Sequence, residues 1–228
     1  MAARAKRLRI YLERGDKRTF ACALDWPGWA RSGRDGHEAI RALLDYAPRY
    51  AKVVRRARLT LDPRPKNRPF EIVQELKGGG GTDFGVPSEV ATNDGRPLTG
   101  KDLERWRALL EASWKAFDAA AKAAKGKRLR LGPCGGGRNL AKMTGHVLEA
   151  EIAYLGALGS RLPRPQRGDD EMAHVRKTAL ETLQAVVDKV PIANPRNTKN
   201  PWKPRYFVRR SAWHALDHAW EIEDRIEP

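Results

Sequence analysis

The sequence contains little cysteine and no long hydrophobic run. Its two cysteines, Cys22 and Cys134, are too few among 228 residues for the disulfide framework of a small secreted protein. No apolar run approaches the roughly 18 residues needed to cross a bilayer. The basic first residues, 1–15, also lack the continuous apolar segment of a signal peptide. We therefore expect a cytoplasmic protein that does not associate with a membrane.

The chain also has too few acidic residues to neutralise its many basic ones. It has 44 Lys and Arg against 28 Asp and Glu, a net charge of +16. Basic residues are spread along the chain, with short clusters at 52–58, 125–130 and 203–210. Such a charge permits nonspecific affinity for phosphate. A solvated, arginine-rich surface is the favoured explanation, and nucleic acid is an alternative partner that we do not favour.

The first third of the chain has the pattern of a small sheet with one helix. Apolar residues alternate with polar ones in 7–13, and 18–26 follows a turn as a return strand, which predicts a hairpin. The stretch 37–47 has helical spacing, with Asp35 as its expected N-cap. Pro48 should interrupt it, and 69–76 alternates like an edge strand. Residues 1–76 are therefore expected to form a small antiparallel sheet with a packed helix.

This region resembles the small HicB-like fold. The hairpin, the turn PGWARSG and the helix HEAIRALLDYA carry the resemblance, which covers residues 7–60. It implies a three- or four-stranded sheet with one packed helix. HicB-like domains often belong to RNA-linked antitoxins, but this chain lacks an obvious DNA-binding module, so we carry over the fold and not the function.

Residues 77–98 are predicted to be a linker, because four consecutive glycines and many turn formers hold regular structure poorly. Beyond them the apolar period changes to 3.6. Four amphipathic helices of similar length follow, which predicts a four-helix bundle over residues 99–228. Thr99 or Asp102 should cap the first of these helices. The expected fold class is thus α+β, with a small α/β domain followed by an all-α bundle.

Three histidines occupy positions that suit a metal site. His146 lies on the buried stripe of the second bundle helix, and His214 and His218 lie four residues apart on one face of the last. Three imidazoles would hold a divalent ion and leave positions for water or substrate. Zinc, nickel, iron and copper all accept such ligands. Alternatively, these are core histidines that hydrogen-bond to neighbouring carboxylates, or surface residues.

Residues 99–226 resemble the DinB-like (DinB/YfiT) family of metal-binding four-helix bundles. The carriers are KMTGHVLEAEIAYL and AWHALDHAWEIEDR, with one early histidine and a late H-x-x-x-H. By matching position, the resemblance implies that His146, His214 and His218 are the metal ligands. Characterised relatives use a divalent metal to ionise a low-molecular-weight thiol, then transfer it to an electrophile or isomerise a substrate.

The resemblance therefore implies a metal-dependent thiol S-transferase that acts on a small-molecule electrophile, with the thiol as co-substrate. The alternative is a non-catalytic binding or regulatory module. Its HicB-like domain and basic loops would contact RNA or a protein partner, and its metal would be structural. The sequence leaves a homodimer open.

Three carboxylates near the histidines are further candidates. Glu149 follows His146 by almost one turn and could be a fourth ligand, a general base or a hydrogen-bond acceptor for an imidazole. The alternative is a solvated helix face. Asp217 and Glu221 could orient the imidazoles, although pairing with surface arginines is the commoner fate of such residues.

Two residues outside the histidine helices are weaker candidates. Cys134 lies in the glycine-rich stretch GPCGGGRN before a helix and is a candidate nucleophile, with a flexible connection as the favoured alternative. Trp202, in a proline-rich loop, is a candidate for the entrance of a cleft. His37 and His174 have no partners at useful spacing and are expected at the surface.

Overall fold

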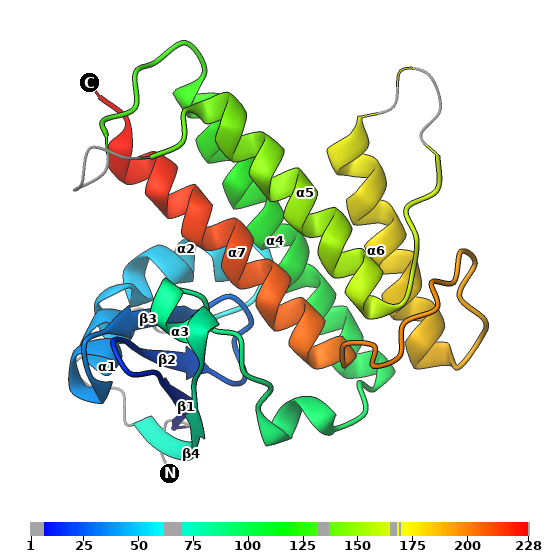
Figure 1. The fold of residues 1–228 in the computed structure, drawn as a ribbon, viewed down its shortest axis with the longest axis horizontal. Coiled ribbons are helices and arrows are strands. Elements are labelled where there is room, and N and C mark those ends of the chain that lie inside the picture. Colours follow the sequence, from blue (N-terminus) through cyan, green and yellow to red (C-terminus); the bar gives the residue numbers. More distant parts are fainter. Residues whose placement is uncertain (1–6, 62–69, 132–136, 165–167, 169, 228) are drawn as a thin grey trace. The chain divides into compact units, whose positions relative to one another are not determined.

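A computed structural model describes residues 7–61, 70–131, 137–164, 168 and 170–227 of the chain. The chain divides into two compact units, 1–96 and 97–228. Within the described residues, the fold is mixed α/β, with one four-stranded sheet in the first unit and seven α-helices in all (Figure 1). None of the helices in this part of the chain is long and apolar enough to span a membrane.

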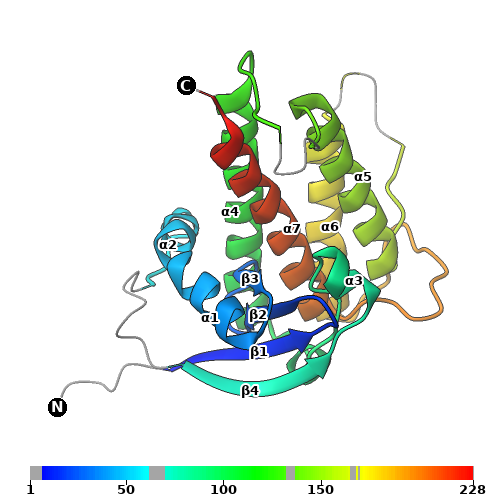
Figure 2. The ribbon, with the colours of Figure 1, turned by 60° about the vertical axis from the view of Figure 1, so that its left-hand side comes forward.

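The first unit is built around a mixed sheet in the order β3-β2-β1-β4 (Figure 2). The hairpin prediction is confirmed, because β1 and β2 pair antiparallel. The expectation of a purely antiparallel sheet is wrong, because β4 pairs with β1 in parallel. A parallel pair needs a crossover connection, and the helices between β3 and β4 supply it. The strands are β1 (Leu8–Arg14), β2 (Thr19–Ala23), β3 (Ala30–Gly33) and β4 (Phe70–Lys77).

The edge strands β3 and β4 differ in how clearly their sequences predict a strand. β4 is the predicted edge strand, and its Phe70, Ile72 and Val73 remain 40–41% exposed. β3 was not predicted. Its four residues, Ala-Arg-Ser-Gly, follow a proline-glycine turn and have no apolar alternation, so only pairing with β2 defines them as a strand.

Two short helices, α1 (Gly36–Asp45) and α2 (Ala47–Arg56), follow the sheet strands. The predicted N-cap is confirmed, because the Asp35 side chain accepts a hydrogen bond of 2.8 Å from the Glu38 amide. Pro48 lies in the first turn of α2, where its missing N–H costs nothing, and so a new helix begins there.

The turn between β2 and β3 is fixed to these helices by two aromatic residues. The Trp29 indole donates a hydrogen bond to the Leu43 carbonyl (2.8 Å), and the Tyr50 hydroxyl donates one to the Pro27 carbonyl (2.7 Å). The two rings stack with centroids 5.2 Å apart. This turn is therefore an anchored part of the core and not a free loop.

The stretch 77–98, expected to be a linker, contains α3 (Gly80–Phe84) and the short 3-10 helix η1 (Thr92–Gly95). The fully buried carboxylate of Glu13 accepts hydrogen bonds from the Thr82 hydroxyl (2.6 Å) and the Ser88 and Glu89 amides (2.9 and 3.1 Å). One side chain from β1 thus orders a glycine-rich segment about 70 residues later. Composition alone could not reveal this contact.

The second unit contains four helices that share one hydrophobic core (Figure 1). The predicted cap of the first is confirmed, since the Thr99 side chain accepts a hydrogen bond from the Asp102 amide (3.2 Å). The last helix packs against the first two, and the third packs against the same two. The four helices are α4 (Gly100–Ala124), α5 (Leu140–Leu158), α6 (Glu171–Asp188) and α7 (Pro204–Arg225).

An ion-pair network, buried at Arg176 and Glu151 and exposed at Asp118, joins three of these helices. Arg176 on α6 donates to Glu151 on α5 (3.0 Å) and to Asp118 on α4 (2.8 Å). Burial raises the pKa of Glu151, and the neighbouring Arg176 charge opposes that shift. Removing Glu151 or Arg176 would leave the buried charge of the other without its close counterion, so this pair connects α5 to α6.

Candidate metal centre

The three histidines predicted as ligands come together between α5 and α7. One ring nitrogen from each of His146, His214 and His218 lies within 4.8 Å of the other two. The Nε2 atoms of His146 and His214 are 3.3 Å apart. The ring centroids are separated by 4.6–5.1 Å. These distances place three imidazoles close enough together to hold one metal ion.

Helix geometry explains this convergence. His214 and His218 are one turn apart on α7, so both rings project toward the same neighbour. That neighbour is α5, which runs beside α7 in Figures 1 and 2 and presents His146 from its second turn. His214 and His218 are buried and His146 is half-buried. The cluster therefore lies below the surface with one partly open side.

The surroundings keep two of the rings neutral. Burial, together with the charges of His218 and Arg210, lowers the pKa of His214 to about 2. Burial also lowers the pKa of His146, as does the charge of Arg138. A neutral imidazole has a lone pair free on one nitrogen, which is the form that binds a metal.

A carboxylate orients the third ring. His218 Nδ1 lies 3.0 Å from Glu221 Oε2, and the other oxygen of Glu221 accepts a hydrogen bond of 2.6 Å from Arg225. The hydrogen bond from His218 lowers the pKa of Glu221 and keeps it ionised. Nδ1–H donation to Glu221 leaves Nε2 of His218 as the metal-binding atom, the arrangement commonly found behind metal-bound histidines.

The donor set fits a metal ion in one further respect. Zinc–nitrogen bonds of 2.0–2.1 Å in a tetrahedron place two ligand nitrogens about 3.4 Å apart, and the His146–His214 separation is 3.3 Å.

The predicted carboxylates have different places in this arrangement. Glu221 orients His218, as the sequence suggested. Glu149 is exposed and raises the pKa of His146 through its charge. Asp217 is half-buried on α7. The metal-binding cluster found in the described part of the chain contains the three histidines.

The remaining candidates lie elsewhere. Cys134 lies outside the described residues. Trp202 is half-buried, with its ring 5.2 Å from that of Tyr154, which in turn is 5.6 Å from the His214 ring. His37 is exposed as predicted, whereas His174 is half-buried with Nε2 3.1 Å from the Pro163 carbonyl oxygen.

Sequence reasoning missed two residues beside the histidines, Arg210 and Tyr154. Arg210 is four residues before His214 on α7, and Tyr154 is eight residues after His146 on α5. The Arg210 guanidinium lies 5.3 Å from the centre of the Tyr154 ring. The same i, i+4 spacing that identified the histidine pair could have identified this second layer.

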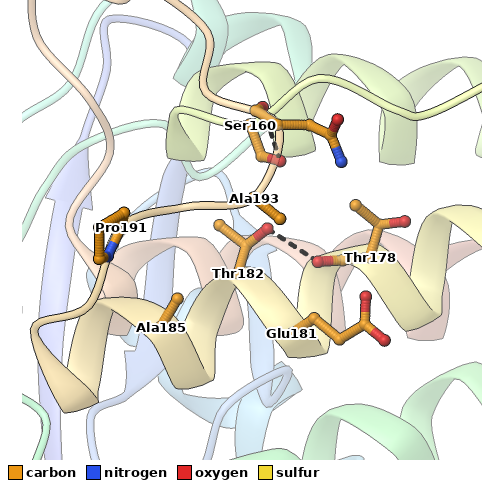
Figure 3. Close-up of a pocket in the computed structure, with 8 residues that line it drawn as sticks. Ser160, Thr178, Glu181, Thr182, Ala185, Pro191 and Ala193 are labelled. Atoms are coloured by element: carbon orange, nitrogen blue, oxygen red, sulfur yellow. Dashed lines mark hydrogen bonds between the residues drawn. The ribbon is translucent and has the colours of Figure 1, made fainter.

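A separate cavity of about 100 Å³ lies between α6 and the segment after it (Figure 3). The Thr182 hydroxyl donates to the Thr178 carbonyl on its wall (2.8 Å). Glu181 on the same wall has a side chain that is 65% exposed. The cavity is lined by Ser160, Thr178, Glu181, Thr182, Ala185, Pro191, Ala193 and Asn194, and so it is distinct from the histidine cluster.

Comparison of the chain with models of known protein families, with curated proteins and with solved structures finds no match. The resemblances to DinB-like and HicB-like proteins therefore remain predictions, carried by the residues described above.

The low pKa of His214 predicts acid sensitivity in the metal-free protein. Its folded-state pKa is about 2 against an ordinary value of 6.5. Below pH 6.5 the unfolded chain binds a proton here that the folded chain does not, so the free energy of unfolding falls as the pH falls. The slope from this group is about 1.4 kcal/mol per pH unit. Urea unfolding in the presence of a chelator measures this effect. Between pH 6 and 5, the free energy of unfolding should fall more steeply for the parent than for His214→Gln. Equal slopes would contradict the low pKa of His214.

Proposed function

We propose that residues 99–228 form a DinB-like four-helix bundle in which His146, His214 and His218 bind one divalent ion, zinc, nickel or iron. We further propose that the protein is a metal-dependent thiol S-transferase that acts on a small electrophile. In this proposal, residues 1–76 are a HicB-like domain. The observation that carries it is the convergence of three imidazole nitrogens within 4.8 Å.

The surroundings of the histidines support a reactive centre more than a purely structural one. Three protein ligands leave further coordination positions open on such a metal, as in catalytic zinc sites. The half-burial of His146 leaves one side of the cluster partly open. A structural site normally has four protein ligands, and the described cluster offers three.

Each residue of the site has a distinct task in this proposal. A bound divalent metal would hold a thiol as its thiolate at neutral pH, and the thiolate is the nucleophilic form. His146, His214 and His218 would bind the ion through their lone pairs. Glu221, itself held by Arg225 (2.6 Å), would keep the His218 ring in place by accepting a hydrogen bond from its Nδ1–H.

Metal content of purified variants tests the binding part of the proposal. His214→Ala and His218→Ala should each lose the metal, because two imidazoles bind a divalent ion much more weakly than three. Helix content by circular dichroism should remain, because the core of the second unit is apolar. His174→Ala removes a histidine outside the cluster and is the matched control. Equal metal in the parent and in both site variants would contradict the assignment.

Thiol alkylation tests the catalytic part. The metal-loaded protein should accelerate the reaction of a small thiol with 1-chloro-2,4-dinitrobenzene at pH 7, and the His218→Ala variant should return the rate to background. The reason is that the metal ionises the thiol well below its ordinary pKa, near 8.5 for a cysteine-like thiol. If the metal-loaded protein leaves both the reaction rate and the ultraviolet absorption of the added thiol unchanged, the transferase proposal is contradicted. A structural metal would then be favoured.

A further inference from the structure

Arg210 and Tyr154 form a second polar layer directly beside the histidine cluster. On α7, Arg210, His214 and His218 follow one another at intervals of four residues, so they line one face of the helix. On α5, His146 and Tyr154 are two turns apart on the face that meets α7. The ring centroids of Tyr154 and His214 are 5.6 Å apart, so the two layers are in contact.

The guanidinium of Arg210 is held in place by aromatic rings. Its central carbon lies 4.8 Å from the centre of the Trp213 ring and 5.3 Å from that of Tyr154. Burial raises the pKa of the Tyr154 hydroxyl, and the charge of Arg210 and a hydrogen bond from it oppose that shift. Cation–π contacts orient an arginine but do not satisfy its N–H donors.

One nitrogen of this guanidinium lacks a hydrogen-bond partner among the described residues. Arg210 Nη1 is buried and has no hydrogen-bond partner among the residues that the structure describes. Arg225, by contrast, has acceptors on the same helix and beyond it: it donates to Glu221 (2.6 Å) and to the Arg130 carbonyl (2.8 Å). A buried donor without an acceptor carries a large desolvation penalty, which an anionic ligand would relieve.

Two arginines bring positive charge close to the cluster. Arg138 acts on His146 from the residues just before α5, and Arg210 acts on His214 from one turn earlier on α7. The carboxylates Glu149 and Glu221 also act on His146, and Glu221 is already paired with His218 and Arg225. A cation such as Arg210 beside the cluster favours an anionic molecule over a neutral one of the same shape.

We propose that Arg210, with the Tyr154 hydroxyl beside it, binds the carboxylate of the thiol co-substrate, so that the enzyme selects small thiols that carry an acid group. This inference rests on the proposed function. Arg210 is one helical turn, about 5.4 Å, from His214. A spacer of two or three carbon atoms between sulfur and carboxylate suits that separation. Arg210 and Tyr154 act in binding and positioning, and no bond changes at them.

The test compares two thiols of equal length, 3-mercaptopropionate and its methyl ester. The protein is loaded with cobalt, whose charge-transfer absorption reports a bound thiolate. The parent should bind the acid at least ten-fold more tightly than Arg210→Gln does, while the two proteins bind the ester within two-fold of each other. Comparing the acid-to-ester ratio between proteins cancels the different acidities of the two thiols. Tyr154→Phe should lose a smaller part of the preference.

Arg107→Gln is the matched control, because it removes the same charge from the exposed face of α4, where Arg107 pairs with Glu111. It should keep the parent's preference for the acid. If Arg210→Gln keeps that preference and binds cobalt normally, or if the parent has none, the inference is overturned while the metal site stands. A parent that binds no cobalt contradicts the proposed function and the inference together.

Discussion

The contact between the Nε2 atoms of His146 and His214 is the interaction on which this account depends. Two ring nitrogens 3.3 Å apart connect α5 to α7 at the level of the histidine cluster. With both rings neutral, one nitrogen must donate to the other. A cation shared by the rings would use both lone pairs at once. The proposed ion would therefore replace a single hydrogen bond with two metal–nitrogen bonds.

Burial and charge around the cluster act in the same direction. They lower the pKa values of His146 and His214, which keeps the lone pairs available. Glu221 and Arg225 fix the third ring. Arg210 adds a cation one turn away, with an unsatisfied donor. Together these features are the ones that the proposed metal, and the proposed negatively charged molecule beside it, would require.

Local sequence patterns predicted much of the fold and the core of the site. The 3.6-residue period gave all four helices of the second unit, since each has an apolar stripe and a clear end signal. The i, i+4 pair on α7 and the single histidine on α5 could be paired because both lie on inward faces. Arg210 was overlooked because arginines are numerous in this chain, although it lies one helical turn before His214.

Long-range contacts account for what the sequence did not reveal. Glu13 is one of many surface-like glutamates in the sequence, yet it orders residues 82–89 from the other end of the unit. β4 pairs in parallel with β1 because the connection through the helices brings the chain back in the same direction. The alternation of apolar residues predicts a strand but does not say whether it pairs in parallel or antiparallel. The Glu151–Arg176–Asp118 network likewise joins three helices whose patterns predict only apolar contacts.

X-ray absorption at the metal edge of the zinc-loaded protein tests the central claim most directly. The account predicts a first shell dominated by nitrogen at about 2.0–2.1 Å, with the outer-shell scattering of three imidazole rings. The spectrum of the His146→Ala protein should lack the scattering of one imidazole ring. A first shell made of oxygen alone, or the same imidazole signal with and without His146, would contradict it.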